Sequence, residues 1–325
     1  MLDIAIIGAG LSGLYLAERL ADGQRNIALF DARDRYGGRI LTVRLANGSA
    51  ADLGPTWVWP EQQPRIVKLC RRLNLALFHQ ADTGLSLYKA TSVAEPVEYV
   101  DKQTHAGAYR IQGGCGCITD ALASNLDNTP LHLGWCLDRV ADCGTYVELA
   151  FSVNGSLRLI KAKQAVLAMP PRLIAARIRF EPALPAKLAD ICHATQTWMA
   201  GHAKAAIAYP KAFWQSQGWS GNALAAYPGA ILSEIYDAGD PQSGSAALFG
   251  FFGIPAQLRE QYRQQLPELV ASHLVTVFGQ SAATPADLQI QDWSGERFTA
   301  TDADSLPPIT HIWTPPQLQA KCYQN

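Results

Sequence analysis

The first thirty residues show three changes of hydrophobic pattern. Residues 2–7 form a nearly continuous apolar run rich in β-branched side chains, which is typical of a strand buried on both faces of a parallel sheet. Residues 11–20 carry apolar side chains at helical spacing, and a second apolar run covers residues 27–30. The pattern predicts a strand, a Gly-rich turn, a helix and a second strand, which is the order of a βαβ unit.

Later patterns predict further elements of both kinds. Asn47-Gly48 is a strong hairpin signal between two short apolar runs, 41–45 and 49–53. The other predicted elements are a helix over 64–77, a β-meander (131–133, 146–153, 157–160 and 165–167), strands over 203–209 and 246–252, and a long helix over 256–278. Residues 80–106 are mixed and poorly periodic. Together these elements predict a two-domain α/β protein, with a Rossmann-like domain and a mixed-sheet α+β domain.

Composition narrows the possible partners and compartment. The chain has 325 residues and a formal net charge of −1, with no long run of Lys and Arg, so no nucleic acid or anionic membrane is expected as a partner. No apolar stretch approaches a membrane span and no leader pattern is present, which favours a cytoplasmic protein. The seven cysteines are irregularly spaced, and Cys115-Gly116-Cys117 is too tightly spaced for paired zinc ligands. We therefore expect free thiols and no metal site.

The turn after the first strand carries the strongest chemical signal, Gly8-Ala9-Gly10-Leu11-Ser12-Gly13. Gly8 permits a tight turn, Gly10 lets the backbone approach a pyrophosphate, and Gly13 lets the helix pack closely on the sheet. The helix that starts at Leu11 and Ser12 offers free amides and the positive end of its dipole to phosphates. Asp31 ends the second strand, where a carboxylate accepts hydrogen bonds from ribose hydroxyls. The sequence therefore predicts a dinucleotide site, and this fingerprint is shared by NAD and FAD.

The next segment separates the two cofactors. Asp31-Ala32-Arg33-Asp34-Arg35-Tyr36-Gly37-Gly38-Arg39 resembles the flavin amine oxidase superfamily, whose members follow the second strand with an acidic residue, Ala, Arg and then Gly-Gly-Arg. The resemblance implies non-covalently bound FAD, with Ala32 and Gly38 in the cofactor-binding turn. It also implies that Arg33 and Arg39 contact the ribose and pyrophosphate region. We interpret Arg35 as a solvated surface residue.

The resemblance continues in order along most of the chain. Residues 52–58 resemble the family segment beside the flavin ring and ribityl chain, and the residues implied to bind there are Gly54, Pro55, Thr56 and Trp57. Residues 109–114 resemble the Gly-Gly element that re-enters the cofactor domain. Leu137 stands where the family commonly has a Val against the adenine. The implied FAD-binding domain comprises 1–79, 107–172 and about 292–325, and the implied substrate domain comprises 80–106 and 173–291.

A single lysine carries the predicted chemistry. Residues 202–214 resemble the family's substrate-domain strand, in which a Lys points at the flavin and holds a water near N5; Lys204 matches that position. Burial among alanines would lower the pKa of this ammonium. The alternative is that Lys204 extends from the strand end to solvent. His202 lies on the same strand face and is interpreted as structural or surface-exposed.

The reaction implied by the resemblance is oxidation of a small-molecule amine. A hydride leaves the carbon next to the nitrogen and reduces flavin N5, the imine hydrolyses, and O₂ reoxidises the flavin to give H₂O₂. Amino-acid oxidases of the superfamily place an Arg after the Asp-Leu-Gly element, whereas this chain has Thr56-Trp57 and no Arg before Arg65. Four tryptophans are candidates either for pocket walls or for plain core: Trp57, Trp59, Trp198 and Trp214. The sequence does not indicate the oligomeric state.

Two departures from the family pattern leave alternatives open. Residues 80–106 replace a much longer helical segment, which implies a reduced substrate domain. Residues 292–299 resemble the family's Trp-containing stretch, but no Phe-Ala-Gly-type strand that closes over the flavin follows His311 in the tail 312–325. This pattern indicates a truncated chain, a partner that supplies the element, or weak FAD retention. The competing functions are another superfamily oxidase or desaturase, and a catalytically inactive nucleotide-binding relative.

Overall fold

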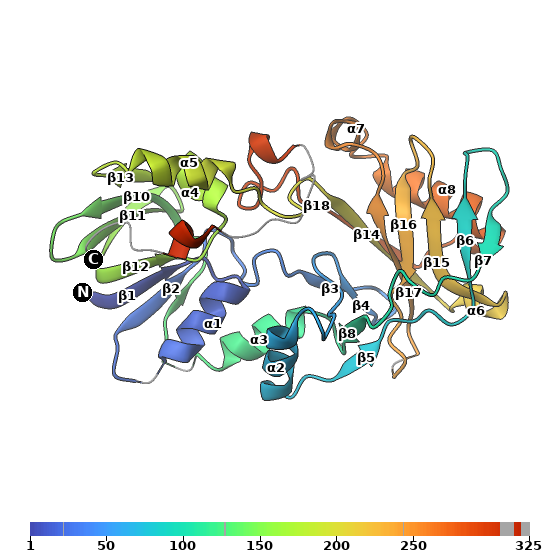
Figure 1. Ribbon diagram of the computed structural model, residues 1–325, viewed down its shortest axis with the longest axis horizontal. Coiled ribbons are helices and arrows are strands. Elements are labelled where there is room, and N and C mark those ends of the chain that lie inside the picture. Colours follow the sequence, from blue (N-terminus) through green and yellow to red (C-terminus); the bar gives the residue numbers. More distant parts are fainter. Residues whose placement is uncertain (22, 127, 243, 306–314, 320–325) are drawn as a thin grey trace. The chain divides into compact units, whose positions relative to one another are not determined.

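The computed structural model describes residues 1–325 except 22, 127, 243, 306–314 and 320–325 (Figure 1). Its chain contacts divide into two compact units, and each unit combines separate stretches of sequence. The first unit comprises Met1–Arg39, Ile118–Gly201 and Trp293–Asn325, and the second comprises Ile40–Cys117 and His202–Asp292. Each unit contains one seven-stranded sheet, so the predicted α/β class with two sheet-based units is confirmed.

The βαβ unit of the first sheet follows the sequence pattern closely. Strand β1 (Leu2–Ile7), helix α1 (Leu11–Leu20) and strand β2 (Ile27–Phe30) have the predicted bounds. Strand β1 runs parallel to β2 on one side and to β12 (Ser156–Leu167) on the other, and β9 (Leu131–His132) continues the parallel part beyond β2. This central position explains the apolar character of β1, because both neighbours and both faces remove it from water.

The antiparallel strands on the other side of β1 differ from the predicted meander. Its strands are β10 (Cys136–Asp142), β11 (Val147–Val153) and β12, with β13 (Arg179–Glu181) parallel to β10. Residues 131–133 belong to the parallel part instead, and the runs 157–160 and 165–167 are one continuous strand. Strand β10 was missed because it carries charges on its exposed side. Arg139 donates there to Glu148 (2.9 Å) and Glu181 (2.8 Å).

Three helices and two short 3-10 turns complete the described elements that belong mainly to the first unit. Helices α4 (Pro171–Arg177) and α5 (Ala186–Ala194) pack against each other, and α3 spans Gly116–Ser124. Two of the 3-10 turns, η2 (Asp302–Asp304) and η3 (Pro316–Gln319), lie here, whereas η1 (Gln280–Ala282) lies in the second unit. The core under β10–β12 is apolar, and its largest buried members include Phe30, Leu149 and Phe151.

The second sheet has the order β18-β14-β17-β16-β15-β6-β7 and is antiparallel except between β15 and β6. Its strands are β14 (Ala203–Tyr209), β15 (Trp219–Ala225), β16 (Leu232–Asp237), β17 (Ala246–Phe252), β18 (Asp287–Asp292), β6 (Leu85–Lys89) and β7 (Val97–Tyr99). The predicted strands 203–209 and 246–252 are therefore confirmed. The poorly periodic stretch 80–106 supplies β6 and β7, two short strands at one edge of the sheet.

Strand β14 is buried along its whole length because both of its faces are covered. Ala203, Ala205 and Ile207 pack in a core with helix α8 (Leu266–Phe278). The alternate residues Ala206 and Ala208 pack in a second core with the hairpin of β3 (Thr42–Arg44) and β4 (Ala50–Asp52). Lys204 lies on this hairpin side, since side chains of a strand alternate between faces.

The hairpin also explains where the chain divides. Leu45, Ala51 and Leu53 share the apolar core of β14, β16 and β17, so residues 40–79 group with the second sheet rather than with residues 1–39. Strands β5 (Leu77–His79) and β8 (Tyr109–Ile111) pair with each other in the same unit. The contact boundaries thus differ from the sequence-based ones. The assignment of the units as FAD-binding and substrate domains stays a prediction.

Two predicted helices are shorter than their patterns. Helix α2 (Pro64–Arg72) ends before Asn74, whose φ of 56° is incompatible with helix continuation. The pattern over 256–278 is two helices, α7 (Ala256–Gln261) and α8, because Pro267 lacks the N–H that an uninterrupted helix would need and is tolerated in the first turn of α8. A short helix, α6 (Phe213–Ser216), follows β14.

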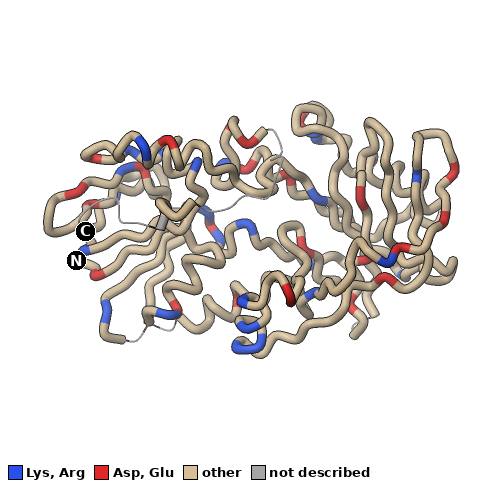
Figure 2. Tube along the Cα trace, viewed as in Figure 1, with Lys and Arg blue, Asp and Glu red and all other residues tan. Residues whose placement is uncertain are grey.

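Acidic and basic residues are nearly equal in number and are mixed along the chain. Figure 2 shows acidic and basic residues interspersed along the trace of each unit, in line with 27 Lys and Arg against 28 Asp and Glu. Within the described part of the chain, no helix combines the length and apolarity that crossing a lipid bilayer demands.

We predict that His273 makes folding stability depend on pH. It is 5 % exposed in α8, its Nε2 donates to the Leu232 carbonyl oxygen (2.9 Å), and burial lowers its pKa from 6.5 to about 4. Between these values the unfolded chain binds more protons than the folded one, so stability falls as the pH falls. The expected loss from pH 7 to pH 5 is about 2 kcal/mol.

The measurement is urea unfolding at both pH values for the wild type and His273→Gln, which keeps an N–H donor but does not titrate. The wild type should lose about 2 kcal/mol more than this variant. His193→Gln, at an exposed site of α5, is the control and should behave as wild type. Equal pH slopes for wild type and His273→Gln would contradict the prediction.

Candidate functional site

In the Gly-rich turn of the first unit, two glycines have no room for a side chain and the third has free space beside it. Gly8 has φ +105°, and a Cβ there would lie 2.4 Å from the carbonyl oxygen of Ala168. A Cβ on Gly13 would lie 1.8 Å from the Gly8 carbonyl oxygen. At Gly10 the nearest atom to a Cβ would be the Gly38 Cα at 3.9 Å. Only Gly10 therefore leaves space that another group can occupy.

Asp31 joins this turn to the segment that follows β2. Its Oδ2 accepts from the Ala9 amide (2.7 Å) and its Oδ1 accepts from the Arg33 amide (2.9 Å). The Gly37 amide donates to the Ala9 carbonyl (2.8 Å), and Gly38 lies against Gly10. The structure thus brings Asp31, Ala32 and Gly38 beside the Gly-rich turn. Their contacts with a cofactor stay a prediction.

The start of helix α1 fits an anionic group. Gly10 is the residue before the helix, no side chain caps this end, and the first turn from Leu11 through Ser12 contains no acidic residue. The amides and the positive end of the helix dipole are therefore available to a phosphate. A diphosphate beside Gly10 agrees with both the open space and the charge, so these residues fit the predicted dinucleotide.

Arg33 is held by two residues that the sequence did not single out. Its Nε donates to Glu296 Oε2 (2.8 Å), and its Nη2 donates to both Glu296 and Thr299 (2.8 Å for Thr299). The guanidinium also lies over the Phe298 ring, 5.6 Å from the centroid. No local pattern could have linked residues so far apart in the chain. The predicted contact of Arg33 with ribose or pyrophosphate stays a prediction.

The other two arginines of the loop are also anchored. Arg35 folds back and donates to the carbonyls of Tyr36 and Gly38 (both 3.0 Å). Its interpretation as a solvated residue is therefore wrong, because the guanidinium braces the turn. Arg39 is exposed and donates to the Trp198 carbonyl (3.3 Å).

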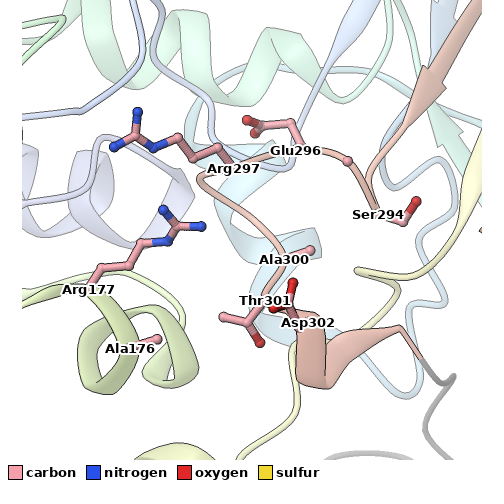
Figure 3. A pocket seen from close by; sticks show the side chains of 9 residues that line it. Ala176, Arg177, Ser294, Glu296, Arg297, Ala300, Thr301 and Asp302 are labelled. Atoms are coloured by element: carbon pink, nitrogen blue, oxygen red, sulfur yellow. The ribbon is translucent and has the colours of Figure 1, made fainter. Parts of the chain in front are cut away.

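A polar pocket of about 420 Å³ lies in the same unit (Figure 3). It is formed by the end of α4 and the segment 294–302, and its lining residues are Ala176, Arg177, Ser294, Gly295, Glu296, Arg297, Ala300, Thr301 and Asp302. Glu296 belongs both to this pocket and to the pair with Arg33. Leu137, the predicted adenine neighbour, is buried in β10 with its side chain in the core of the first unit.

In the second unit, Lys204 is 2 % exposed on β14. Its Nζ donates to the Gly54 carbonyl (3.1 Å) and to the Thr56 hydroxyl, and it lies 4.0 Å from the centroid of the Phe249 ring. The alternative of a side chain reaching solvent is therefore wrong. Burial lowers the pKa of Lys204 to about 7, although the charge of Asp52 opposes this shift.

Aromatic rings surround this ammonium. We define the aromatic cluster as Trp57, His105, Tyr236, Phe249 and Phe251. Trp57 is central, with ring centroids 4.7 Å from His105 and 5.1 Å from Tyr236, and its Nε1 donates to Gln80 (2.8 Å). The sequence indicated Trp57 but missed the other four cluster members, because they come from a loop and from two strands distant from Trp57 in the sequence.

The remaining predicted residues have plainer surroundings. Gly54 is half-buried and supplies a carbonyl to Lys204, whereas Pro55 is exposed. Trp214 is core, because it is fully buried and its Nε1 donates to Asp237 (2.8 Å). Trp198 is exposed by 41 %, and His202 is half-buried with an Nδ1 that contacts no hydrogen-bond partner.

A carboxylate shares the face of Lys204. Lys204 stands opposite Phe251 on β17, and Phe251 stands opposite Glu234 on β16. Directly opposed residues of antiparallel strands point to the same face, and neighbouring strands are about 4.8 Å apart. Glu234 is half-buried and accepts a hydrogen bond from the Tyr236 hydroxyl (2.7 Å). The face thus has a cation at one strand, aromatic rings between, and an anion two strands away.

Comparison with known families assigns the chain. The model of the flavin containing amine oxidoreductase family matches residues 81–321, and a model of NAD(P)-binding Rossmann-like domains matches residues 6–73. The chain belongs to the flavin-containing amine oxidoreductase family. The resemblance inferred from the motifs is therefore confirmed, and with it an FAD-dependent oxidoreductase.

Individual relatives agree with the family. Putrescine oxidase of Kocuria rosea is 23% identical, over 91% of this chain and 83% of its own length. Flavin-containing amine oxidase A of Equus caballus is 36% identical over 105 residues, which are 32% of this chain and 18% of that protein. Both relatives are named as amine or diamine oxidases, and the second is named as flavin-containing.

Solved structures of family members share the fold. Cyclohexylamine oxidase from Brevibacterium oxydans superposes with a TM-score of 0.77 at 20% identity, over 98% of this chain and 89% of that one. A putrescine oxidase with putrescine bound gives 0.75 at 18% identity, over 94% and 89%. The tail 312–325, in which the sequence predicts no closing strand, lies largely outside the described residues, which include only 315–319 of it.

We predict that two glycine substitutions separate folding from cofactor binding. Gly13→Ala places a methyl group against the Gly8 carbonyl, so it should destabilise the protein by roughly 1–3 kcal/mol or more. Gly10→Ala meets no close atom and should keep the wild-type melting temperature. It should nevertheless weaken FAD binding about tenfold or more, because the methyl group enters the space beside the predicted diphosphate.

The measurements are thermal melts without added FAD and fluorescence titrations of apoprotein with FAD. A Gly10→Ala variant that binds FAD as tightly as wild type would remove this turn from the proposed cofactor site. Gly48→Ala, at the open tip of the β3–β4 hairpin, is the control for a glycine substitution; its φ of +84° should cost stability without changing FAD affinity.

Proposed function

We propose that the chain oxidises primary amines with non-covalently bound FAD and that Lys204 is its catalytic residue. The observation that carries the proposal is the position of Lys204, buried on an aromatic sheet face with a pKa near neutrality. A structural lysine gains little from such a place, because burying an ammonium is costly. Family membership supplies the reaction class, and the buried amine supplies the candidate group.

The first unit would hold the dinucleotide. We assign the diphosphate to the turn of Gly8, Gly10 and Gly13 and to the first amides of α1, at Leu11 and Ser12. The remaining proposed contacts in this unit are Asp31, Ala32, Arg33, Gly38, Arg39 and Leu137. In the second unit we assign Gly54, Pro55, Thr56 and Trp57. Bound FAD would take two electrons from the amine and pass them to O₂.

Lys204 would hold a water molecule or accept a proton near the reacting nitrogen. With a pKa of about 7, a sizeable fraction of the side chain is neutral at neutral pH and has a lone pair. A neutral amine can hold a water molecule or accept a proton, and the Gly54 carbonyl and Thr56 hydroxyl fix its direction. The aromatic cluster keeps bulk water away and favours an uncharged substrate amine.

The overall reaction balances without a further reductant. A primary amine, O₂ and water give an aldehyde, ammonia and H₂O₂. The carbon next to the nitrogen loses two electrons, and O₂ gains them. Water supplies the aldehyde oxygen when the imine hydrolyses.

We further propose that the substrate carries a second cationic group. Glu234 shares the face of Lys204, and aromatic rings separate the two. A carboxylate in that position suits a remote ammonium, and the rings suit a methylene chain between the two nitrogens. A relative that aligns over 91% of this chain is a putrescine oxidase, and putrescine is such a diamine. A short aliphatic diamine is therefore the proposed substrate class.

The function is tested first by the visible absorption spectrum of the purified protein, before and after titration with FAD. Bound flavin bands that bleach on anaerobic addition of putrescine, and return with O₂ as peroxide forms, are the expected result. A protein that never binds FAD, or whose bound flavin no amine reduces, would overturn the proposal.

Lys204→Met should slow anaerobic flavin reduction by the amine by about 10²-fold or more, because a positioned proton acceptor is lost. FAD affinity should stay within a few-fold of wild type. The control is Lys89→Met, since Lys89 is also a buried lysine of the second sheet and its Nζ donates to a carbonyl, that of Ala94 (2.6 Å). Stopped-flow rates equal to wild type for Lys204→Met would exclude it from the reaction.

Glu234→Gln should raise KM for putrescine about 10- to 100-fold, because a charged hydrogen bond to the remote ammonium is worth about 1.5–3 kcal/mol. The value of kcat/KM for butylamine, which has the same chain but one nitrogen, should change little. A parallel loss for both substrates would show that Glu234 maintains the fold of the face rather than recognising the second charge.

A further inference from the structure

A buried carboxylate outside the predicted set lies beside the lysine site. Asp52 ends strand β4 and is 4 % exposed. The Cys115 amide donates to its Oδ1 (2.9 Å) and Oδ2 (3.2 Å), and the Thr42 hydroxyl donates to its Oδ1. Thr42 in turn accepts from the Gly116 amide (2.7 Å). The carboxylate is therefore clamped by the hairpin on one side and the 115–116 backbone on the other.

The packing around this clamp leaves no spare room. A Cβ on Gly114 would lie 2.4 Å from Thr42 Cγ2 and 2.9 Å from Asp52 Oδ1. The backbone at 114–116 thus approaches the carboxylate as closely as glycine allows. Such an approach fixes the carboxylate in one orientation, because any rotation would break at least one of its hydrogen bonds.

The same clamp reaches Lys204 through a short stretch of chain. Gly54 and Thr56 follow Asp52 by two and four residues, and both accept hydrogen bonds from the Lys204 ammonium. The Cys115 thiol lies 3.8 Å from the Thr56 carbonyl. Residues 52–56 are therefore held at Asp52 by the Cys115 amide and at Thr56 by the Cys115 thiol, and they present both acceptors to Lys204.

Three ionisable groups near Lys204 influence its pKa through their charge. The groups that act on Lys204 are Asp52, Cys115 and Arg110. Burial raises the pKa of Asp52, whereas its hydrogen bond from Thr42 and the charges of Lys204 and Arg110 lower it. Arg110 also faces Asp237 and Asp240, and it donates to the carbonyls of Ala238 and Gly239 (both 2.8 Å). Asp52 is thus the carboxylate whose charge favours the protonated form of the lysine.

We propose that Asp52 is a positioning residue for Lys204: it fixes the 52–56 segment that carries both acceptors of the ammonium and supplies the compensating negative charge. This inference rests on the proposed role of Lys204. Asp52 itself touches neither substrate nor cofactor in the proposal. It acts by deciding how the lysine points and at which pH the lysine loses its proton.

The test is Asp52→Asn in the full-length holoenzyme, with two readouts. Removing the negative charge should lower the pKa of Lys204 by about one unit or more, because Asp52 favours the charged lysine. Carbon-13 NMR of protein produced with lysine labelled at Cε measures this directly without modifying the buried amine, with the Lys204 signal assigned by its loss in Lys204→Met. The midpoint of the rise of the flavin-reduction rate with pH should move to lower pH by the same amount.

Asp237→Asn is the matched control. Asp237 is also a buried carboxylate of this unit, bonded to Trp214 Nε1 and to the Gly239 amide (2.6 Å), and it faces Arg110 but is not among the groups that act on Lys204. Its substitution should leave both midpoints at the wild-type value, whatever it does to stability.

Thr42→Val provides a milder variant in case Asp52→Asn does not fold. It keeps the carboxylate but removes a hydrogen bond that favours its charged form, so the Lys204 midpoint should fall in the same direction by a smaller amount. Unchanged Lys204 midpoints in the folded variants would overturn the proposal. Because the NMR titration does not depend on turnover, a failed catalytic role for Lys204 would be distinguished from a failed role for Asp52.

Discussion

A lysine ammonium removed from water is the constraint on which the second unit depends. Leaving a charge of this kind without partners costs on the order of several kcal/mol, so the surroundings must either pair it or neutralise it. The structure does both in part, with two oxygen acceptors, an aromatic face and a coupled carboxylate around Lys204. The hairpin β3–β4, the 52–56 segment and strand β17 all contribute to that environment. Catalytic use of the lysine would follow from an arrangement that already prevents it from staying fully protonated.

The first unit depends on a different constraint, the close approach of backbone atoms in the Gly-rich turn. Gly8 and Gly13 let backbone atoms of the strand, turn and helix approach where a Cβ would clash with a carbonyl oxygen, while Asp31 ties the Ala9 amide to the next loop. The result is a helix start without a cap and without nearby acidic residues. The two units therefore differ in their polar groups. The first leaves uncharged backbone amides available at a helix start, and the second encloses the ammonium of Lys204.

Local sequence patterns predicted the elements whose contacts lie within a short stretch of the chain. The βαβ unit, the Asn47-Gly48 hairpin and strands β14 and β17 follow from periodicity and turn chemistry within a few residues. Strand β10 was missed because charges on its exposed side break the apolar pattern, and the helix over 256–278 was wrong because Pro267 was not weighed against it. Glu234 and the aromatic cluster could not be predicted, since they meet Lys204 only through strand register. The family assignment succeeded because ordered motifs span such distances.

The pair between Arg33 and Glu296 joins residues 263 positions apart, and both belong to the first unit. During synthesis, the amino-terminal βαβ unit would leave the ribosome long before Glu296 is made. Residues 202–292 of the second unit are translated in the interval. The loop containing Arg33 therefore cannot pair with Glu296 until most of the second sheet has been synthesised. Closing so long a loop is slow compared with forming the βαβ unit. The Gly-rich turn and the loop of Arg33 are consequently among the first parts of the protein to be made and among the last to be completed.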